Sequence, residues 1–411
     1  MIIHSKMCIP DLRVPLDDYA IPDNEGVFEE AQRGEDIYYS DYESSSDSSS
    51  DDDNDDDNDI EEFDDNDDGE ENNDGGSRGD DDSYDQVDEE VFAYLYDVNS
   101  SMHPNTLFVG STVGALSFLP DPSINIIALG LSNGVIKMYI YDDIDQQYLR
   151  AINDVHSNKI TVLEFDETGE YIYSACKDNN VSVSDVKTGQ LKAYFEEAHT
   201  AGSFVTALSF IDKNLFATGG KDGVVNVWDI RANGCRFSLK KSEDSIDSMI
   251  TINDNNNQPT LACTTGDGTL TIFDLSTKKI VIQSEPYKSV LTSCVTMQQK
   301  TKVVCGTGVG SLITFNTGDF NAFHEEFPCF DKNAAVTRLV PLTENIIINA
   351  LDNGNIRATH LFPNSHLGIV GQHQNRIDLL GASPNGEILV STTPFSVVVA
   401  FWYTELHLHR D

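Results

Sequence analysis

A repeat of about 44 residues runs through the last three-quarters of this 411-residue chain and constrains its fold more than any other feature. Each unit ends in a short β-rich run closed by a pair of residues, of which Trp228-Asp229 is the clearest. The pairs follow one another at intervals of 45, 44, 45, 42, 44 and 43 residues and are Tyr139-Ile140, Ser184-Asp185, Trp228-Asp229, Phe273-Asp274, Phe315-Asn316, Thr359-His360 and Trp402-Tyr403. This period predicts an all-β fold, a seven-bladed β-propeller with four strands in each blade.

A break in charge divides the chain. Residues 1–90 hold 35 Asp or Glu and four Lys or Arg, whereas the remaining 321 residues hold 34 and 22. Charges of one sign repel each other, and so polar a segment buries too little apolar surface to offset its ordering entropy. We therefore expect residues 1–90 to be acidic and largely disordered, 91–105 to be a linker, 106–404 to form the propeller and 405–411 to be a short tail.

Several classes of protein are disfavoured by the composition. Seven scattered cysteines without a C-x-x-C pair argue against a disulfide framework or a zinc site and indicate a reducing compartment. Cys176, Cys263 and Cys305 fall at matching points of three repeats, where we expect them to be buried. No apolar run is long enough to span a membrane, and no secretion signal is recognised. The net charge of −43 disfavours direct binding to nucleic acid.

The third unit shows the pattern of a blade most clearly. Three β-rich runs between Val205 and Asp229 are separated by turn signals, and Asp222-Gly223 is typical of a tight hairpin. The pattern resembles the WD40 repeat family, in which a His, a Ser or Thr, an Asp and a Trp form a hydrogen-bonded chain within a blade. The resemblance implies a structural tetrad of His199, Thr218, Asp222 and Trp228.

The other units match this tetrad only in part. The second carries His156, Ser174 and Asp178 but has Ser184 in place of the Trp, and the seventh keeps His373, Ser391 and Trp402 without the Asp. The fourth keeps only Asp267, with Phe273 for the Trp. We therefore expect most blades to depend on apolar packing, and the three histidines to stabilise blades rather than bind metal.

The ring needs one further strand to close. The run from Thr106 to Gly110 precedes the first unit and belongs to no other repeat. We expect it to form the outer strand of blade seven, which joins the two ends of the propeller in one sheet and removes an exposed edge.

No enzyme motif appears in the sequence, so neither catalytic residues nor a cofactor are expected. The run Gly306-Thr307-Gly308-Val309-Gly310 is similar to part of a nucleotide-binding loop, but a strand-like run follows where a helix would be required. We interpret it as a hairpin within a blade. His407 and His409 lack further candidate ligands, so no metal site is expected.

One motif suggests a specific partner. The stretch Trp228-Asp229-Ile230-Arg231 is similar to the motif through which many WD40 proteins engage the adaptor of cullin-4 ubiquitin ligases, with Arg231 supplying a planar cation. The alternative is that Trp228, Asp229 and Arg231 only cap their blade.

The acidic segment contains four serines that each precede an acidic residue by three positions, the spacing preferred by casein kinase 2: Ser44, Ser48, Ser49 and Ser50. Phosphorylation at these candidates would add about −1.5 to −2 charges per site. The segment is either a passive solubilising tail or a binding site for basic proteins such as ribosomal proteins, histones or import factors, through an attraction that salt would screen.

Several stretches go beyond the generic repeat, and they include 214–231, 265–270, 283–286, 304–306 and, most specifically, 353–358 with 361–364 and 368–373. In order and spacing they resemble the WD repeat-containing protein 55 family over about residues 106–403. The resemblance implies a non-catalytic scaffold associated with the nucleolus and with production or processing of ribosomal RNA. The chain lacks the basic tail of relatives, so a partner would have to carry it into the nucleus, and the cytoplasm is the alternative location.

The sequence therefore predicts a non-catalytic WD40 scaffold for protein–protein interactions in ribosome biogenesis, monomeric within larger assemblies, with pre-ribosomal factors as partners. The first alternative is a substrate receptor of a cullin-4 ligase that acts through Trp228–Arg231. The second is a chaperone for basic proteins that acts through the acidic segment.

Overall fold

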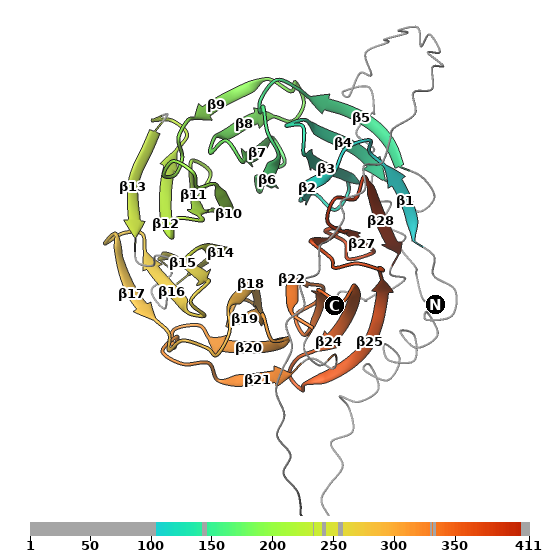
Figure 1. The fold of residues 1–411 in the computed structure, drawn as a ribbon. Coiled ribbons are helices and arrows are strands. Elements are labelled where there is room, and N and C mark those ends of the chain that lie inside the picture. Colours follow the sequence, from blue (N-terminus) through green and yellow to red (C-terminus); the bar gives the residue numbers. More distant parts are fainter. Residues whose placement is uncertain are drawn as a thin grey trace, which may run out of the picture. The chain divides into compact units, whose positions relative to one another are not determined.

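The computed structural model describes residues 104–141, 146–232, 234–240, 244–253, 258–328, 331 and 334–403. These residues form seven four-stranded antiparallel sheets arranged as blades around a central channel (Figure 1). The predicted all-β, seven-bladed propeller is confirmed. No helix occurs among the described residues, hence none that could span a membrane. Residues 1–103 and 404–411, which include the expected disordered segment and the short tail, lie outside the described residues.

The first four blades each take four consecutive strands, from the innermost strand outward. Blade one consists of β2 (Val113–Phe118), β3 (Ile126–Leu131), β4 (Ile136–Tyr141) and β5 (Gln146–Ile152). Blade two consists of β6 (Ile160–Phe165), β7 (Tyr171–Cys176), β8 (Val181–Asp185) and β9 (Leu191–Phe195). Blade three consists of β10 (Val205–Phe210), β11 (Leu215–Gly220), β12 (Val224–Asp229) and β13 (Gly234–Lys240). Blade four consists of β14 (Ile246–Asn253), β15 (Pro259–Thr265), β16 (Leu270–Asp274) and β17 (Lys279–Gln283).

The remaining blades follow the same order except at the closure. Blade five consists of β18 (Leu291–Met297), β19 (Lys302–Thr307), β20 (Ser311–Asn316) and β21 (Glu325–Pro328). Blade six consists of β22 (Val336–Pro341), β23 (Ile346–Leu351), β24 (Asn355–His360) and β25 (Ser365–Gln372). Blade seven consists of β26 (Leu379–Ala382), β27 (Ile388–Thr392), β28 (Val398–Tyr403) and, as its outer strand, β1 (Asn105–Phe108).

The closure of the ring follows the expectation for the first strand. β1 pairs antiparallel with β28, and the register places Asn105 opposite Phe401 and Phe108 opposite Val398. Two segments almost 300 residues apart thus share one sheet, as Figure 1 shows by the contact of the blue-green β1 with the dark red β28. Because the sheet closes, no blade is left without its outer strand.

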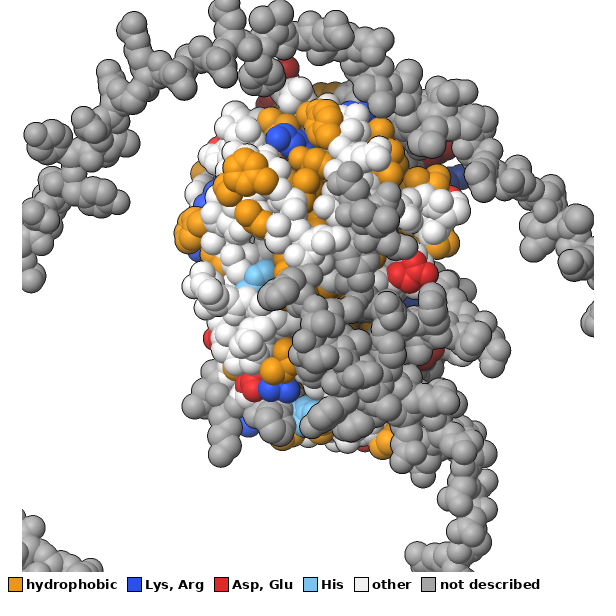
Figure 2. Space-filling view, turned by 90° about the vertical axis from the view of Figure 1, so that its right-hand side faces the viewer, with side chains coloured by type: hydrophobic (Ala, Val, Ile, Leu, Met, Phe, Trp, Pro, Cys, Tyr) orange, Lys and Arg blue, Asp and Glu red, His pale blue; other side chains and the backbone are white. Residues whose placement is uncertain are grey.

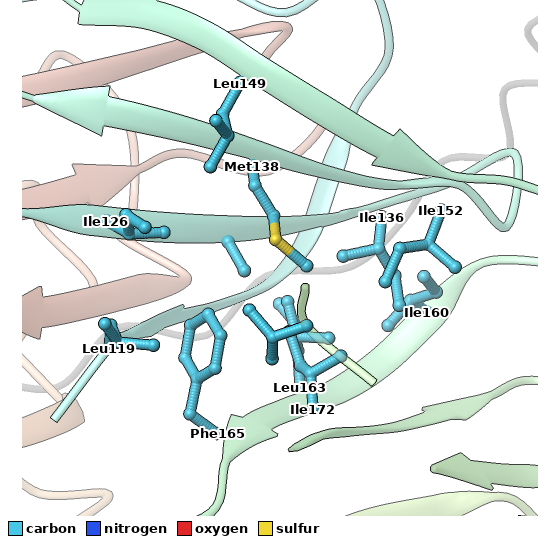
Figure 3. Packing of buried hydrophobic residues seen from close by; sticks show 13 residues of the cluster. Leu119, Ile126, Ile136, Met138, Leu149, Ile152, Ile160, Leu163, Phe165 and Ile172 are labelled. Carbon is cyan, nitrogen blue, oxygen red and sulfur yellow. The ribbon is translucent and has the colours of Figure 1, made fainter. Parts of the chain in front are cut away.

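The apolar core is divided among the seven gaps between neighbouring blades. In the gap between blades one and two, Ile126, Met138 and Leu149 face Leu163 and Phe165 (Figure 3). Equivalent clusters fill the other six gaps, and together they form a closed circle of cores. Burial of a large apolar side chain contributes about 1.5–3 kcal/mol. Each blade is therefore stabilised mainly by its two neighbours, as the incomplete tetrads suggested.

Two smaller expectations are also confirmed. Cys176, Cys263 and Cys305 have no exposed surface and pack within the sheets. Gly308 lies in the turn between β19 and β20, so the glycine-rich run is a hairpin of blade five. Gly310 has a φ of 85°, a conformation that glycine adopts without steric cost.

Candidate functional site

The tetrad of blade three ties the loop that enters the blade to its second and third strands. Trp228 Nε1–H donates to Thr218 Oγ1 at 2.9 Å, and Thr218 lies 3.0 Å from His199 Nε2. His199 Nδ1 lies 3.0 Å from Asp222 Oδ1. Burial lowers the pKa of His199, so its ring is neutral, and the tautomer that satisfies every group carries its proton on Nδ1. The four residues form one continuous chain of hydrogen bonds.

Blade seven repeats most of this chain. His373 Nε2 and Trp402 Nε1 both bond Ser391 Oγ, at 2.7 and 2.8 Å. The His373 and Trp402 rings meet edge to face with centroids 5.7 Å apart. The histidine therefore serves its blade here as well.

Blade two departs from the pattern that its sequence suggests. His156 Nε2 bonds Ser174 Oγ at 2.8 Å, and Ser182 Oγ completes the cluster 2.7 Å from Ser174. Asp178 does not bond His156 but accepts from Ser157 Oγ at 2.7 Å and from an adjacent Asn side chain. Within the described residues, His156 Nδ1 is buried without a partner. Ser184, at the Trp position, is buried, and its hydroxyl joins no hydrogen bond among these residues.

Blade six replaces the tetrad with a charged cluster that sequence reasoning did not identify. Asp331 lies in the loop before β22 and accepts two hydrogen bonds from Arg357, from Nε at 2.8 Å and Nη2 at 2.7 Å. Asn355 and Asn353 also donate to it, at 2.8 and 3.2 Å. The side-chain hydrogen bond from Arg357 lowers the pKa of Asp331 to about 2. The run 353–358, the most specific part of the family resemblance, thus holds this loop.

The predicted adaptor-binding residues lie on blade three at the turn between β12 and β13. Trp228 is buried, and its indole is used by the tetrad. Arg231 is 65% exposed, but its Nε and Nη2 both donate to Asp229, at 3.0 and 2.9 Å. Only the guanidinium of Arg231 is therefore presented to a partner, and the role of the motif in adaptor binding stays a prediction.

The innermost strands of the first six blades begin alike, with a β-bulge at the second residue. In blades two, three and five this residue is a threonine whose hydroxyl donates to a carbonyl of the next blade. These bonds run from Thr161 to Val205 at 2.8 Å, from Thr292 to Val336 at 2.7 Å and from Thr206 to Ile246. They fix the spacing of adjacent blades around the channel.

One residue from the innermost strand of each blade lines the channel, and the seven form a complete ring. In blades one to six it is the third residue of the strand, and in blade seven it is the first residue of β26. From blade one onward the members are Ala115, Val162, Ala207, Ser248, Ser293, Arg338 and Leu379. Six of them are small or apolar, and Arg338 is the single charged member. The cavity that they enclose with the next residue of each strand has a volume of about 190 Å³. Glu164 also lines it, and burial raises the pKa of Glu164 to about 8, so it is mostly neutral at physiological pH. Arg338 is the single cation of this lining, which also includes the carboxylate of Asp247.

One end of the channel opens into a wider mouth of about 720 Å³. Its rim is made of turns between the second and third strands, such as Gly308, and of loops that connect blades, such as Phe204. Four cations and three carboxylates line the mouth: Lys159, Lys177, Arg338, Arg376, Asp247, Asp352 and Asp378. The mouth therefore has a small positive excess in a strongly acidic protein.

Three exposed hydrophobic residues lie on the face of the ring that carries the mouth. Phe395 is 90% exposed in the turn between β27 and β28, and Val290 and Val309 of blade five are 40% and 42% exposed. Arg231 and the described chain ends at residues 104 and 403 lie at the opposite end of the strands. The side of the ring in Figure 2 instead shows hydrophobic side chains scattered among uncharged ones. Scattered residues of this kind are ordinary on a protein surface.

The mouth was missed in the sequence because its residues come from different repeats. An alignment of the seven strand starts would have found Arg338, which stands where the other blades have a small or apolar residue. The phosphorylation candidates Ser44, Ser48, Ser49 and Ser50, as well as His407 and His409, lie outside the described residues.

Comparison with known proteins gives a match over the whole described ring. The family model WDR55 matches residues 104–406. WD repeat-containing protein 55 homolog of Drosophila erecta is 34% identical over 322 residues, which are 78% of this chain and 62% of that protein. The homolog of Drosophila persimilis is 37% identical over 281 residues, which are 68% and 54%. The chain thus spans 54–62% of the length of these relatives.

Solved structures share the fold. A chain of the crystal structure of the mitotic checkpoint complex superimposes with a TM-score of 0.63 and covers 74% of this chain and 92% of its own length. Its sequence identity is 15%, so the likeness concerns the propeller alone.

Proposed function

Because the chain belongs to the WD repeat-containing protein 55 family, we propose that it is a non-catalytic scaffold for protein–protein interactions in ribosome biogenesis. The observation that carries this proposal is the match of the family model across the whole ring, from β1 to β28. The assignment to production or processing of ribosomal RNA rests on the family resemblance of the sequence.

The geometry supports a binding rather than a catalytic role. Three of the histidines and two partly buried carboxylates have structural hydrogen bonds within or between blades. The face that carries the mouth instead offers two arginines and exposed hydrophobic residues, a combination that protein-binding surfaces use. Pre-ribosomal proteins are the partners we expect there, and the nucleolus is the expected location.

Depletion of the protein in cells tests this function. We expect precursor ribosomal RNA to accumulate or fall, nucleolar morphology to change, and a tagged full-length chain that reaches the nucleolus to restore both. Unchanged precursor levels and morphology after complete depletion would rule the function out.

Affinity purification separates the scaffold from the ligase receptor. Wild type and Arg231→Ala should recover the same pre-ribosomal proteins, since Arg231 lies at the end of the ring away from the mouth. Arg236→Ala, an exposed change on β13, is the matched control. The names of the two relatives mention no ubiquitin ligase, and Asp229 already holds the Arg231 guanidinium. A cullin-4 adaptor recovered with wild type and with Arg236→Ala, but lost with Arg231→Ala, would reverse this preference.

A further inference from the structure

Arg338 is a long cation in a ring of short side chains. It occupies the third position of β22, where six other blades have Ala, Val, Ser or Leu. It lines both the channel and the mouth. A propeller does not need an arginine here, because the other six blades close the same ring of side chains without one.

The two arginines of blade six differ in how they are satisfied. Arg357 is 8% exposed and forms a bidentate ion pair with Asp331. No hydrogen bond or ion pair joins Arg338 to any residue that the structure describes, and burial lowers the pKa of its guanidinium. Arg338 is half-buried, and Asp378 and Asp247 act on its charge only through space, so its guanidinium is partly desolvated and incompletely compensated. Arg338 is therefore poorly explained as a structural group and well suited to receive an anion.

Two carboxylates, Asp378 and Asp247, act on the charge of Arg338 and favour its protonated form. Both already have other partners: Asp378 accepts from Arg376 Nε at 3.1 Å, and Asp247 accepts from Ser245 Oγ at 2.8 Å. The donors of Arg338 thus remain available. Across the ring, Lys159 and Lys177 of blade two line the same mouth and add positive charge.

Exposed apolar side chains lie on the same face of the ring as these cations, on blades five and seven. Val290 lines the mouth, and Val309 lies in the next turn of the same blade. Phe395 precedes Ser396, whose carbonyl accepts a hydrogen bond from the mouth residue Val113 at 3.4 Å. Phe395 has a φ of 59°, a left-handed conformation that is strained for a bulky side chain, and strained residues cluster at ligand-binding sites. Arginine with an exposed aromatic residue is a common combination at binding hot spots.

We propose that the mouth binds an extended acidic segment of a partner protein, with one Asp or Glu carboxylate seated on Arg338 and neighbouring apolar side chains on Val290, Val309 and Phe395. This inference rests on the proposed scaffold function and names the class of its partner. A guanidinium pairs with a carboxylate through two parallel hydrogen bonds, which gives both affinity and orientation.

The dimensions and the charge favour a peptide over nucleic acid. The mouth has room for a short segment, while the channel of about 190 Å³ below it admits a single side chain. The small positive excess of the rim matches the few charges of a peptide, whereas a polyanion would bring many phosphates to a rim that also carries three carboxylates. At physiological salt the Debye length of about 8 Å limits repulsion from charges elsewhere in the chain.

A random-peptide display selection on the full-length chain tests the proposal. We expect enrichment of sequences with an acidic residue beside large apolar ones. The best peptide should lose about 30-fold or more in affinity for Arg338→Met, and a similar factor when its acidic residue becomes the amide. When Arg338→Met is combined with the amide form of the peptide, the loss of affinity should be little larger than for either change alone. Arg338→Lys should retain part of the affinity, and Arg236→Met on the outer strand should leave it unchanged.

Stability distinguishes a binding arginine from a structural one. We expect the unfolding midpoint of Arg338→Met to stay equal or rise, because a partly desolvated charge that bonds no described residue is removed. A fall in the midpoint would assign Arg338 to the fold and overturn the proposal.

Three outcomes of the selection would also overturn the proposal: no peptide, peptides without acidic residues, or peptides bound equally by Arg338→Met. Binding of an oligo-uridine RNA that depends on Arg338, where no peptide binds, would overturn it as well. Peptide affinity and precursor RNA levels are independent readouts, so either proposal can fail alone.

Discussion

Blades three and six solve the same structural problem with different chemistry. Each must hold the loop that enters the blade against its hairpin. Blade three uses a chain of hydrogen bonds around the neutral His199, whereas blade six uses the carboxylate of Asp331 as a centre for Arg357 and two asparagines. The comparison teaches that the loop must be tied down, and that the residues that tie it can be exchanged as a set.

Blade five supports this view with a third solution. Tyr287, in the loop before its first strand, donates its hydroxyl to Glu326 of the outer strand β21 at 2.6 Å. Ser311 Oγ and Lys288 Nζ bond the same carboxylate, at 2.9 and 3.0 Å. Most buried polar groups are paired, but the fold does not dictate which pairs are used.

The largest effect is expected in blade six. Asp331→Ala should lower the free energy of unfolding by about 3–5 kcal/mol, because it leaves Arg357 desolvated without its anion. Urea unfolding measures this loss. Arg357→Met in the same background should recover part of it, since both partners are then removed. Equal losses from the single and double variants would show that the ion pair is not what holds the loop.

A smaller effect is expected in blade three. Thr218→Val should cost about 1–3 kcal/mol, because it removes the oxygen that serves both Trp228 and His199. Thr314→Val in β20 is the matched control, since Thr314 is equally buried and its hydroxyl has no partner among the described residues. The control should be neutral or stabilising. If both variants lost the same amount, the hydrogen-bonded chain would contribute nothing of its own.

The pH dependence separates histidine-centred from carboxylate-centred blades. Burial lowers the pKa of His156 from 6.5 to about 4, so between these values the unfolded chain binds a proton that the folded chain does not. Stability should therefore fall as the pH drops through that window, and His156→Asn should flatten the slope. The pKa of Asp331 is lowered from 3.8 to about 2, so blade six should lose its contribution only in more acidic solution. Unfolding measured across both windows checks the order of the two losses.

The smallest effect is expected at the exposed edge of blade three. Arg231→Ala should leave the unfolding midpoint unchanged, because the guanidinium is mostly exposed and solvent screens its pair with Asp229. Differential scanning calorimetry would detect a shift. A lower midpoint would mean that the Asp229 pair stabilises the turn after β12.

Sequence reasoning succeeded where a feature repeats along the chain. The spacing of the terminal pairs gave seven blades, and the unassigned run at Thr106 identified the closing strand. The residues proposed for the tetrad are joined by hydrogen bonds in blade three. In blade two the same reading placed Asp178 beside His156, but the carboxylate turns to Ser157 instead. Side-chain direction in a short turn is decided by local competition among donors, which spacing does not describe.

The sequence by itself determined the number of blades, the order of their strands and the buried cysteines, because apolar periodicity and turn residues act over a few neighbouring positions. Only the tertiary structure decided that Asp331 meets Asn353, Asn355 and Arg357, and that Arg338 is the single cation that lines the channel cavity. Such groups converge because closure of the ring brings separate repeats to one axis. The role of such a group depends on the residues that face it from other repeats, and no local sequence pattern encodes those residues.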